Sequence, residues 1–129
     1  MKKYIIILSV LLSISISCSK NDKNECVSNR LGYVTSVNSP SNGIINEIIN
    51  IEVNFGVNNS CGGFGEFIET QNGNVRTIEV MARYEGCFCA QYAPLITVNY
   101  EFITQNSGNY ELRFKSNETD FITVNLSIE

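Results

Sequence analysis

The sequence predicts an all-β fold in which two antiparallel sheets pack face to face as a sandwich. From residue 31 onward, apolar and polar residues alternate with period two in segment after segment, and clusters of Asn, Gly, Pro and Ser separate the segments. A strand with one apolar and one polar face is typical of an antiparallel sheet with one solvated side. About seven such strands in a domain of roughly 100 residues are expected to form two packed sheets.

Five of the expected strands alternate cleanly, and two are less regular. Asn72 and Gly73 both tolerate a positive φ, so this dipeptide predicts a tight hairpin. The clean segments are 49–57, 78–84, 96–102, 110–114 and 122–128, and the less regular ones are 31–37 and 64–70.

One run of isoleucines departs from the strand pattern. Ile44, Ile45, Ile48 and Ile49 have helical spacing. Because β-branched residues dominate the run and Gly43 precedes it, we interpret Ile44 and Ile45 as loop residues that lead into a strand.

Composition limits the functions that the chain can have. The chain of 129 residues is long enough for one domain, and with a net charge of −4 and only 9 Lys and Arg it is poorly suited to binding nucleic acid. The absence of His removes the Ser-His-Asp and Cys-His mechanisms and the commonest metal ligand. We expect no enzyme activity, no cofactor and no metal site. The carboxylates on the expected strands alternate with apolar residues and are interpreted as solvated: Glu52, Glu79, Glu101 and Glu111.

The first residues of the chain have the pattern of a secretory signal peptide. Lys2 and Lys3 precede the almost wholly apolar run 4–16. As a helix this run would be roughly 20 Å long, which is too short to cross a bilayer core of about 30 Å.

The end of this segment resembles the processing site of bacterial lipoproteins. Ser17 provides the small residue and Cys18 the lipidated cysteine, whereas Ser15 departs from the usual leucine. The polar residues after Cys18 resemble the charged tether of lipoproteins from the Bacteroidota. The resemblance implies a lipid anchor at Cys18 in the cell envelope, in an outer membrane and facing the periplasm or the surface. We therefore divide the chain into a signal peptide at 1–17, a tether at 18–30 and a sandwich domain at 31–129.

The cysteine count agrees with export. If Cys18 carries lipid, four cysteines remain, which is typical of two disulfides in a small exported domain. Cys87 and Cys89 point to one face of an extended chain and are badly placed to bond each other, so Cys61 is expected to pair with one and Cys26 with the other. The residues leave both options open. A four-thiolate metal site is the alternative, but zinc sites usually have paired C-x(2–4)-C spacings, and a redox motif C-x-x-C is absent.

The C-terminal part of the chain resembles an immunoglobulin-like module. The segment 100–102 and then 108–114 are similar to the Y-x-F and G-x-Y-x-L-x-F pattern of such modules. The resemblance covers 31–129 and implies an Ig-like sandwich. It also implies that Tyr110, which follows a turn glycine, is a corner tyrosine.

Two loops contain the candidate binding residues. Phe64 lies in the glycine-rich segment 58–65, which either presents this ring to a partner or is a disulfide-anchored crossover whose glycines have positive φ; we favour the crossover. Phe88 and Tyr92, together with Tyr84 just before them, either bind a sugar or a protein, or fill the end of the sandwich. If the disulfides bring the loops together, that end is the best candidate for a binding surface.

Three functional hypotheses follow. The first is a lipid-anchored, non-enzymatic Ig-like module that contacts a protein partner or has an accessory role in an envelope complex. The alternative is a small surface lipoprotein that binds a glycan through Phe64, Phe88 and Tyr92, for which the three rings would have to form an exposed row. The third is a metal or redox protein that uses the four remaining cysteines. The fold alone does not decide among them.

Overall fold

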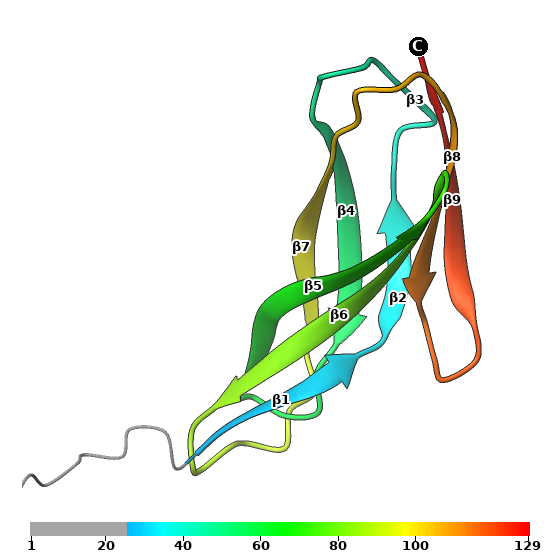
Figure 1. Ribbon diagram of the computed structural model, residues 1–129. Helices are drawn as coiled ribbons and strands as arrows, with labels where there is room; N and C mark the ends of the chain where they lie inside the picture. The colour runs from blue at the N-terminus through cyan, green and yellow to red at the C-terminus, as the bar shows by residue number, and fades with distance from the viewer. Residues whose placement is uncertain (1–25) are drawn as a thin grey trace, which may run out of the picture.

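The structure is a β-sandwich of nine strands in two sheets, which confirms the predicted fold class (Figure 1). It is a computed structural model and describes residues 26–129. The predicted signal peptide, the lipidation site Cys18 and residues 18–25 of the predicted tether lie outside the described residues. Within the part described, no helix is long and apolar enough to cross a membrane.

The larger sheet has six strands and the smaller sheet has three. The larger sheet runs in the order β1-β6-β8-β9-β3. β8 pairs with the first part of β6 and β1 with its last part, while β5 pairs with β6 along almost its whole length. The smaller sheet runs in the order β2-β4-β7. The strands of the larger sheet are β1 (Val27–Gly32), β3 (Asn42–Gly43), β5 (Gly62–Asn72), β6 (Val75–Glu85), β8 (Gly108–Lys115) and β9 (Phe121–Ile128), and those of the smaller sheet are β2 (Val34–Asn38), β4 (Ile49–Gly56) and β7 (Leu95–Phe102).

Two strand pairs are parallel, which departs from the purely antiparallel expectation. They are β6 with β8 and β3 with β9. Between β6 and β8 the chain crosses to the other sheet to form β7 and then returns. Such a crossover lets two strands of one sheet run in the same direction, which a short hairpin does not allow.

The first predicted strand, 31–37, is in fact two strands in different sheets. β1 pairs with β6 and β2 pairs with β4, with Tyr33 between them. β1 begins at Val27, so residues 27–30, which we assigned to the tether, belong to the sheet. These residues are exposed or half-buried and show no alternation, because backbone pairing with β6 rather than burial holds them in place.

The predicted hairpin at Asn72-Gly73 forms, but its central residues are Gly73 and Asn74. Asn72 pairs with Val75 across the turn, and Gly73 has φ +61°. A positive φ at the first central position is the requirement of a type II′ turn, which only glycine meets without strain.

The core lies between the two sheets and is formed by the inward-facing residues of the alternating strands. On β4, buried and exposed or half-buried positions alternate from Ile49 to Gly56. Burying one large apolar side chain contributes about 2 kcal/mol. Residues with no exposed surface include Ile51, Val53, Phe55, Ile78, Val80, Phe102, Leu112 and Phe114.

Tyr110 is the corner tyrosine that the resemblance implied. Its ring is buried, and its hydroxyl donates to the carbonyl oxygen of Asn106 at 2.8 Å. The same hydroxyl lies 2.8 Å from Oγ1 of Thr104. These bonds hold the β7–β8 connection against the end of the core.

The Tyr110→Phe variant is expected to lower the free energy of unfolding by about 1 kcal/mol, because the ring stays buried while its hydroxyl bonds are lost. Urea unfolding followed by far-UV circular dichroism measures this change. Tyr92→Phe is the matched control, since the Tyr92 side chain is 66% exposed and no hydrogen bond is found for its hydroxyl within residues 26–129. Equal effects of the two variants would contradict the corner assignment.

Candidate functional site

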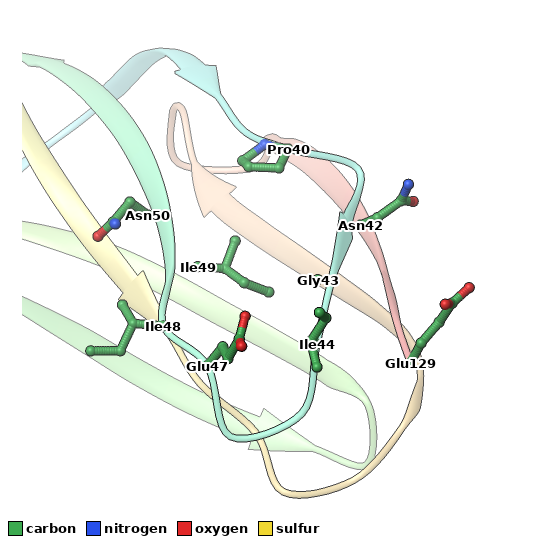
Figure 2. A pocket seen from close by; sticks show the side chains of 9 residues that line it. All are labelled: Pro40, Asn42, Gly43, Ile44, Glu47, Ile48, Ile49, Asn50 and Glu129. Carbon is green, nitrogen blue, oxygen red and sulfur yellow. The ribbon is translucent and has the colours of Figure 1, made fainter.

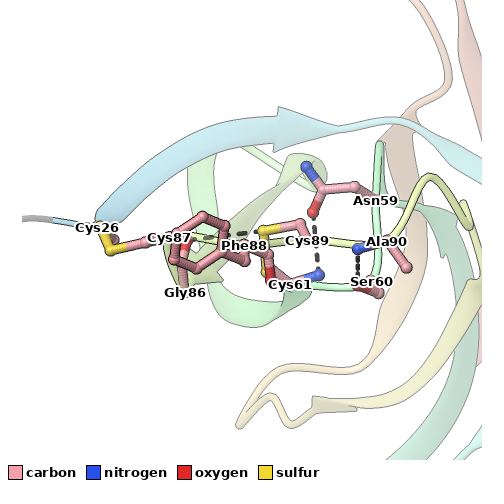
Figure 3. Close-up of a disulfide and its surroundings, with 9 residues drawn as sticks. All are labelled: Cys26, Asn59, Ser60, Cys61, Gly86, Cys87, Phe88, Cys89 and Ala90. Atoms are coloured by element: carbon pink, nitrogen blue, oxygen red, sulfur yellow. Dashed lines mark hydrogen bonds between the residues drawn. A yellow bond between two sulfur atoms is a disulfide. The ribbon is translucent and has the colours of Figure 1, made fainter.

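Two disulfides lie together at one end of the sandwich, which we call the disulfide end (Figure 3). Cys26 is bonded to Cys87 with their Cα atoms 5.0 Å apart, and Cys61 is bonded to Cys89 with a Cα separation of 5.5 Å. The expectation of two disulfides without a bond between Cys87 and Cys89 is confirmed, and the structure decides between the two pairings that the sequence left open. The sulfurs of Cys26, Cys61, Cys87 and Cys89 are all engaged in these two disulfides.

Backbone hydrogen bonds fix the loops around these disulfides. The Gly86 N–H donates to the Cys26 carbonyl at 2.9 Å, and the Glu85 N–H donates to the Cys61 carbonyl at 3.1 Å. The Ala90 N–H donates to Oγ of Ser60 at 2.8 Å, while the Ser60 N–H donates to the Ala90 carbonyl at 3.1 Å. The disulfides therefore bring the two candidate loops together, as the hypothesis of a binding end requires.

The glycines of the segment 58–65 have a different role from the one we expected. Within residues 26–129, the glycines with positive φ are Gly73, Gly86 and Gly108, so Gly62, Gly63 and Gly65 are not selected by φ. Gly62 and Gly65 allow close packing instead: a Cβ on Gly62 would lie 2.8 Å from the Tyr84 ring, and one on Gly65 would lie 2.7 Å from the Met81 carbonyl oxygen. The segment is the predicted crossover, from β4 in the smaller sheet to β5 in the larger sheet.

Gly86 is where positive φ matters at this end. Its φ is +132°, and a Cβ there would lie 2.8 Å from the Cys61 sulfur. Because L-residues rarely adopt this conformation, glycine is needed for the chain to turn out of β6 between the two disulfides.

The three candidate aromatic residues have different environments. Phe64 is 38% exposed and packs against Phe67, with ring centroids 4.8 Å apart, and against Phe55 at 6.2 Å. This contact continues the row of core rings through Tyr100 and Phe114, so Phe64 belongs to the edge of the core. Phe88, in contrast, is fully exposed, as is most of Tyr92.

An exposed row of three rings is therefore not formed, which counts against glycan binding through Phe64, Phe88 and Tyr92. A hollow of about 310 Å³ does lie beside the disulfides. Arg30 lines it, with its guanidinium 5.9 Å from the centroid of the buried Tyr84 ring. The Tyr84 hydroxyl accepts from the Asn58 N–H at 2.8 Å, so this ring supports the crossover loop.

The opposite end of the sandwich contains a second apolar surface, which we call the isoleucine end: Ile44, Ile45 and Ile48 in the loop between β3 and β4, with Ile103 after β7 (Figure 1). Ile44 is 55% exposed and Ile48 is 54% exposed. Hydrogen bonds hold the loop, since the Ile45 N–H donates to the Glu129 carbonyl at 3.0 Å and the Asn46 N–H donates to the Thr104 carbonyl at 2.8 Å.

A hollow of about 530 Å³ opens at this end, with Ile44, Ile48 and Glu47 among its lining residues (Figure 2). We interpreted Ile44 and Ile45 only as residues entering a strand, and the structure does place them in a loop. The feature of the sequence that could have predicted this exposed apolar surface is the departure of the isoleucine run from the strand pattern. Apolar residues in a loop have no sheet face against which they can be buried.

Within the described residues, three ion pairs join charged side chains on the strand surfaces. Nζ of Lys115 lies 3.2 Å from Oε1 of Glu79, and Nε of Arg113 lies 2.6 Å from Oε1 of Glu111. Within residues 26–129, no three His, Cys, Asp or Glu side chains gather as a metal site would require. Burial raises the pKa of the Tyr100 phenol well above its usual range, so this ring remains protonated in the core.

Comparison of the chain with models of protein families gives a match within the sandwich. The model of the ORF11 beta-sandwich domain matches residues 51–126, from β4 to β9. No curated protein and no solved structure matches the chain. The matched region contains Cys61, Cys87 and Cys89 but excludes Cys26 and β1. Because the match covers more than half of the 129 residues, the chain belongs to the ORF11 beta-sandwich domain family.

Proposed function

We propose that this chain is a lipid-anchored lipoprotein of the bacterial cell envelope, and that its β-sandwich works by contacting a protein partner rather than by catalysing a reaction. The observation that carries the proposal is the arrangement of the two ends. The described chain enters at the disulfide end, at Cys26, and the exposed isoleucines of the loop 44–48 lie at the opposite end (Figure 1).

The disulfides support export to an oxidising compartment. Cys26–Cys87 closes a sequence separation of 61 residues, and Cys61–Cys89 closes one of 28. Structural disulfides of this kind persist outside the reducing cytosol. The four cysteines of the described residues pair among themselves, which supports the assignment of the remaining cysteine of the sequence, Cys18, to lipidation.

The isoleucine end supports contact with a protein. Ile44 and Ile48 are about half exposed beside the hollow, and Glu47 supplies a charge among them. Exposed apolar side chains with a polar border are typical of protein contact surfaces. At the far end of the domain from the anchored segment, this surface is open to a large partner.

Lipidation is tested by comparing the full chain with its Cys18→Ser variant in a bacterial host fed a palmitate analogue. The full chain is expected to incorporate the label and to sediment with membranes, whereas Cys18→Ser is expected to do neither. Intact-mass analysis measures the added acyl groups. An unlabelled, uncleaved full chain would overturn the anchored function.

Protein contact is tested by placing a photo-crosslinking residue at position 48 or, as a control, at Thr123 on an exposed position of β9. In the native envelope, the residue at position 48 is expected to form a discrete crosslinked species that the control does not form. Identical patterns from the two positions would contradict contact through the isoleucine end.

A further inference from the structure

The loop between β6 and β7 has the most exposed apolar residues of the described domain. Phe88 is fully exposed, Tyr92 is 66% exposed and Leu95, at the start of β7, is 64% exposed. Phe88 and Tyr92 lie four residues apart in this one loop, and exposed apolar side chains on a shared surface mark a site of contact.

This loop is covalently joined to the place where the chain enters the domain. Cys87, the neighbour of Phe88, is bonded to Cys26, and the Gly86 N–H donates to the Cys26 carbonyl at 2.9 Å (Figure 3). A restraint on the chain just before Cys26 therefore also restrains the position of Phe88.

The reach of the preceding segment places this end close to the bilayer. Eight residue steps separate Cys18 from Cys26, and an extended chain of this length spans at most about 28 Å. The sandwich continues from the disulfide end along β6, whose eleven residues are about 33 Å long. A lipid on Cys18 therefore keeps the disulfide end within about 28 Å of the membrane.

The chemistry of the disulfide end matches a lipid surface. No Asp, Glu, Lys or Arg occurs in residues 86–100 or in residues 53–65, which form the two joined loops and the strand segments beside them. The charged residues at the end of β6, Arg83 and Glu85, form an ion pair with each other. Placing an uncharged loop among headgroups costs no ion desolvation, and aromatic side chains favour the boundary between headgroups and acyl chains.

We propose that the disulfide end lies on the membrane surface, with Phe88 and Tyr92 in the interfacial region of the bilayer. This inference rests on the proposed lipid anchor at Cys18. The acyl chains hold the protein at the membrane, and the Cys26–Cys87 bond fixes which end of the sandwich lies against it. The domain then stands in a defined orientation and presents the isoleucine end outward.

The test uses the absence of tryptophan from the chain. A Phe88→Trp variant of the full, acylated lipoprotein contains one tryptophan, and Ile48→Trp at the isoleucine end is the matched control. Both are reconstituted in phosphatidylethanolamine and phosphatidylglycerol vesicles, with and without brominated acyl chains. Bromine quenches tryptophan only on close approach, so quenching reports immersion.

The tryptophan of Phe88→Trp is expected to lose emission intensity in brominated vesicles and to emit at shorter wavelength, whereas that of Ile48→Trp is expected to do neither. If intact mass shows acylation but Phe88→Trp is not quenched, the membrane contact is wrong while the anchor stands. A blue shift without quenching would mean that the tryptophan contacts protein rather than acyl chains, and would overturn the proposed membrane contact. Equal quenching of both variants would exclude a fixed orientation of the domain. A chain without acyl groups would overturn both the anchor and this inference.

Discussion

Reduction of both disulfides is expected to unfold the domain under conditions in which the oxidised form is stable. In the chain-entropy view, a link across 61 residues stabilises by about 4 kcal/mol and one across 28 residues by about 3.5 kcal/mol. Domains of this size are stable by about 5–15 kcal/mol, so the loss of both links removes much or all of that stability. Urea unfolding by far-UV circular dichroism, with and without reductant, measures the change.

Double variants separate the two contributions. Cys26→Ala with Cys87→Ala, and Cys61→Ala with Cys89→Ala, each remove one link without leaving a free thiol. Each is expected to lower the free energy of unfolding by about 2–5 kcal/mol. Cys18→Ala is the control and is expected to leave the unfolding midpoint of the oxidised protein unchanged. Unchanged midpoints in both double variants would contradict a stabilising role, and non-reduced peptides with other linkages would contradict the pairing.

The Phe114→Ala variant is expected to lower the free energy of unfolding by about 3–5 kcal/mol, because it removes a fully buried ring and leaves a cavity. Phe114 lies on β8 in the centre of the larger sheet, and its ring packs perpendicular to that of Tyr100 with centroids 5.6 Å apart. Denaturant unfolding of the oxidised domain measures the loss.

Phe88→Ala is the matched control for this prediction, since the same substitution is made at a fully exposed phenylalanine. It is expected to change stability by no more than about 0.5 kcal/mol, as for other exposed positions. Similar losses in the two variants would show that the loop ring is part of the core. That result would also remove the basis for its contact with the bilayer.

The strands could be predicted from the sequence because alternation is a local property of the chain. Ile51, Val53 and Phe55 are separated by Glu52 and Asn54, and the structure buries the first set and leaves the second exposed or half-buried. The presence of two disulfides could also be predicted, because an even number of cysteines remains once Cys18 is set aside.

The candidate site could be predicted only in part. Phe64 and Phe88 lie in similar glycine- and cysteine-containing segments of the sequence, yet Phe64 packs beside Phe67 in β5 while Phe88 is fully exposed. The difference arises because β5 continues directly from Gly62 through Phe64, whereas β7 does not begin until Leu95. The isoleucine end was missed because its surface is built from two loops that are far apart in sequence.

By itself, the sequence determined which residues of the five regularly alternating strands face inward, that the domain is an all-β sandwich and that Cys87 pairs with a distant cysteine. Only the tertiary structure decided that this partner is Cys26, that the segment 31–37 divides between two sheets and that β6 pairs in parallel with β8. The physical reason is range: side-chain alternation is set by neighbours two residues away, whereas pairing between strands and sulfurs depends on the packing of the whole core.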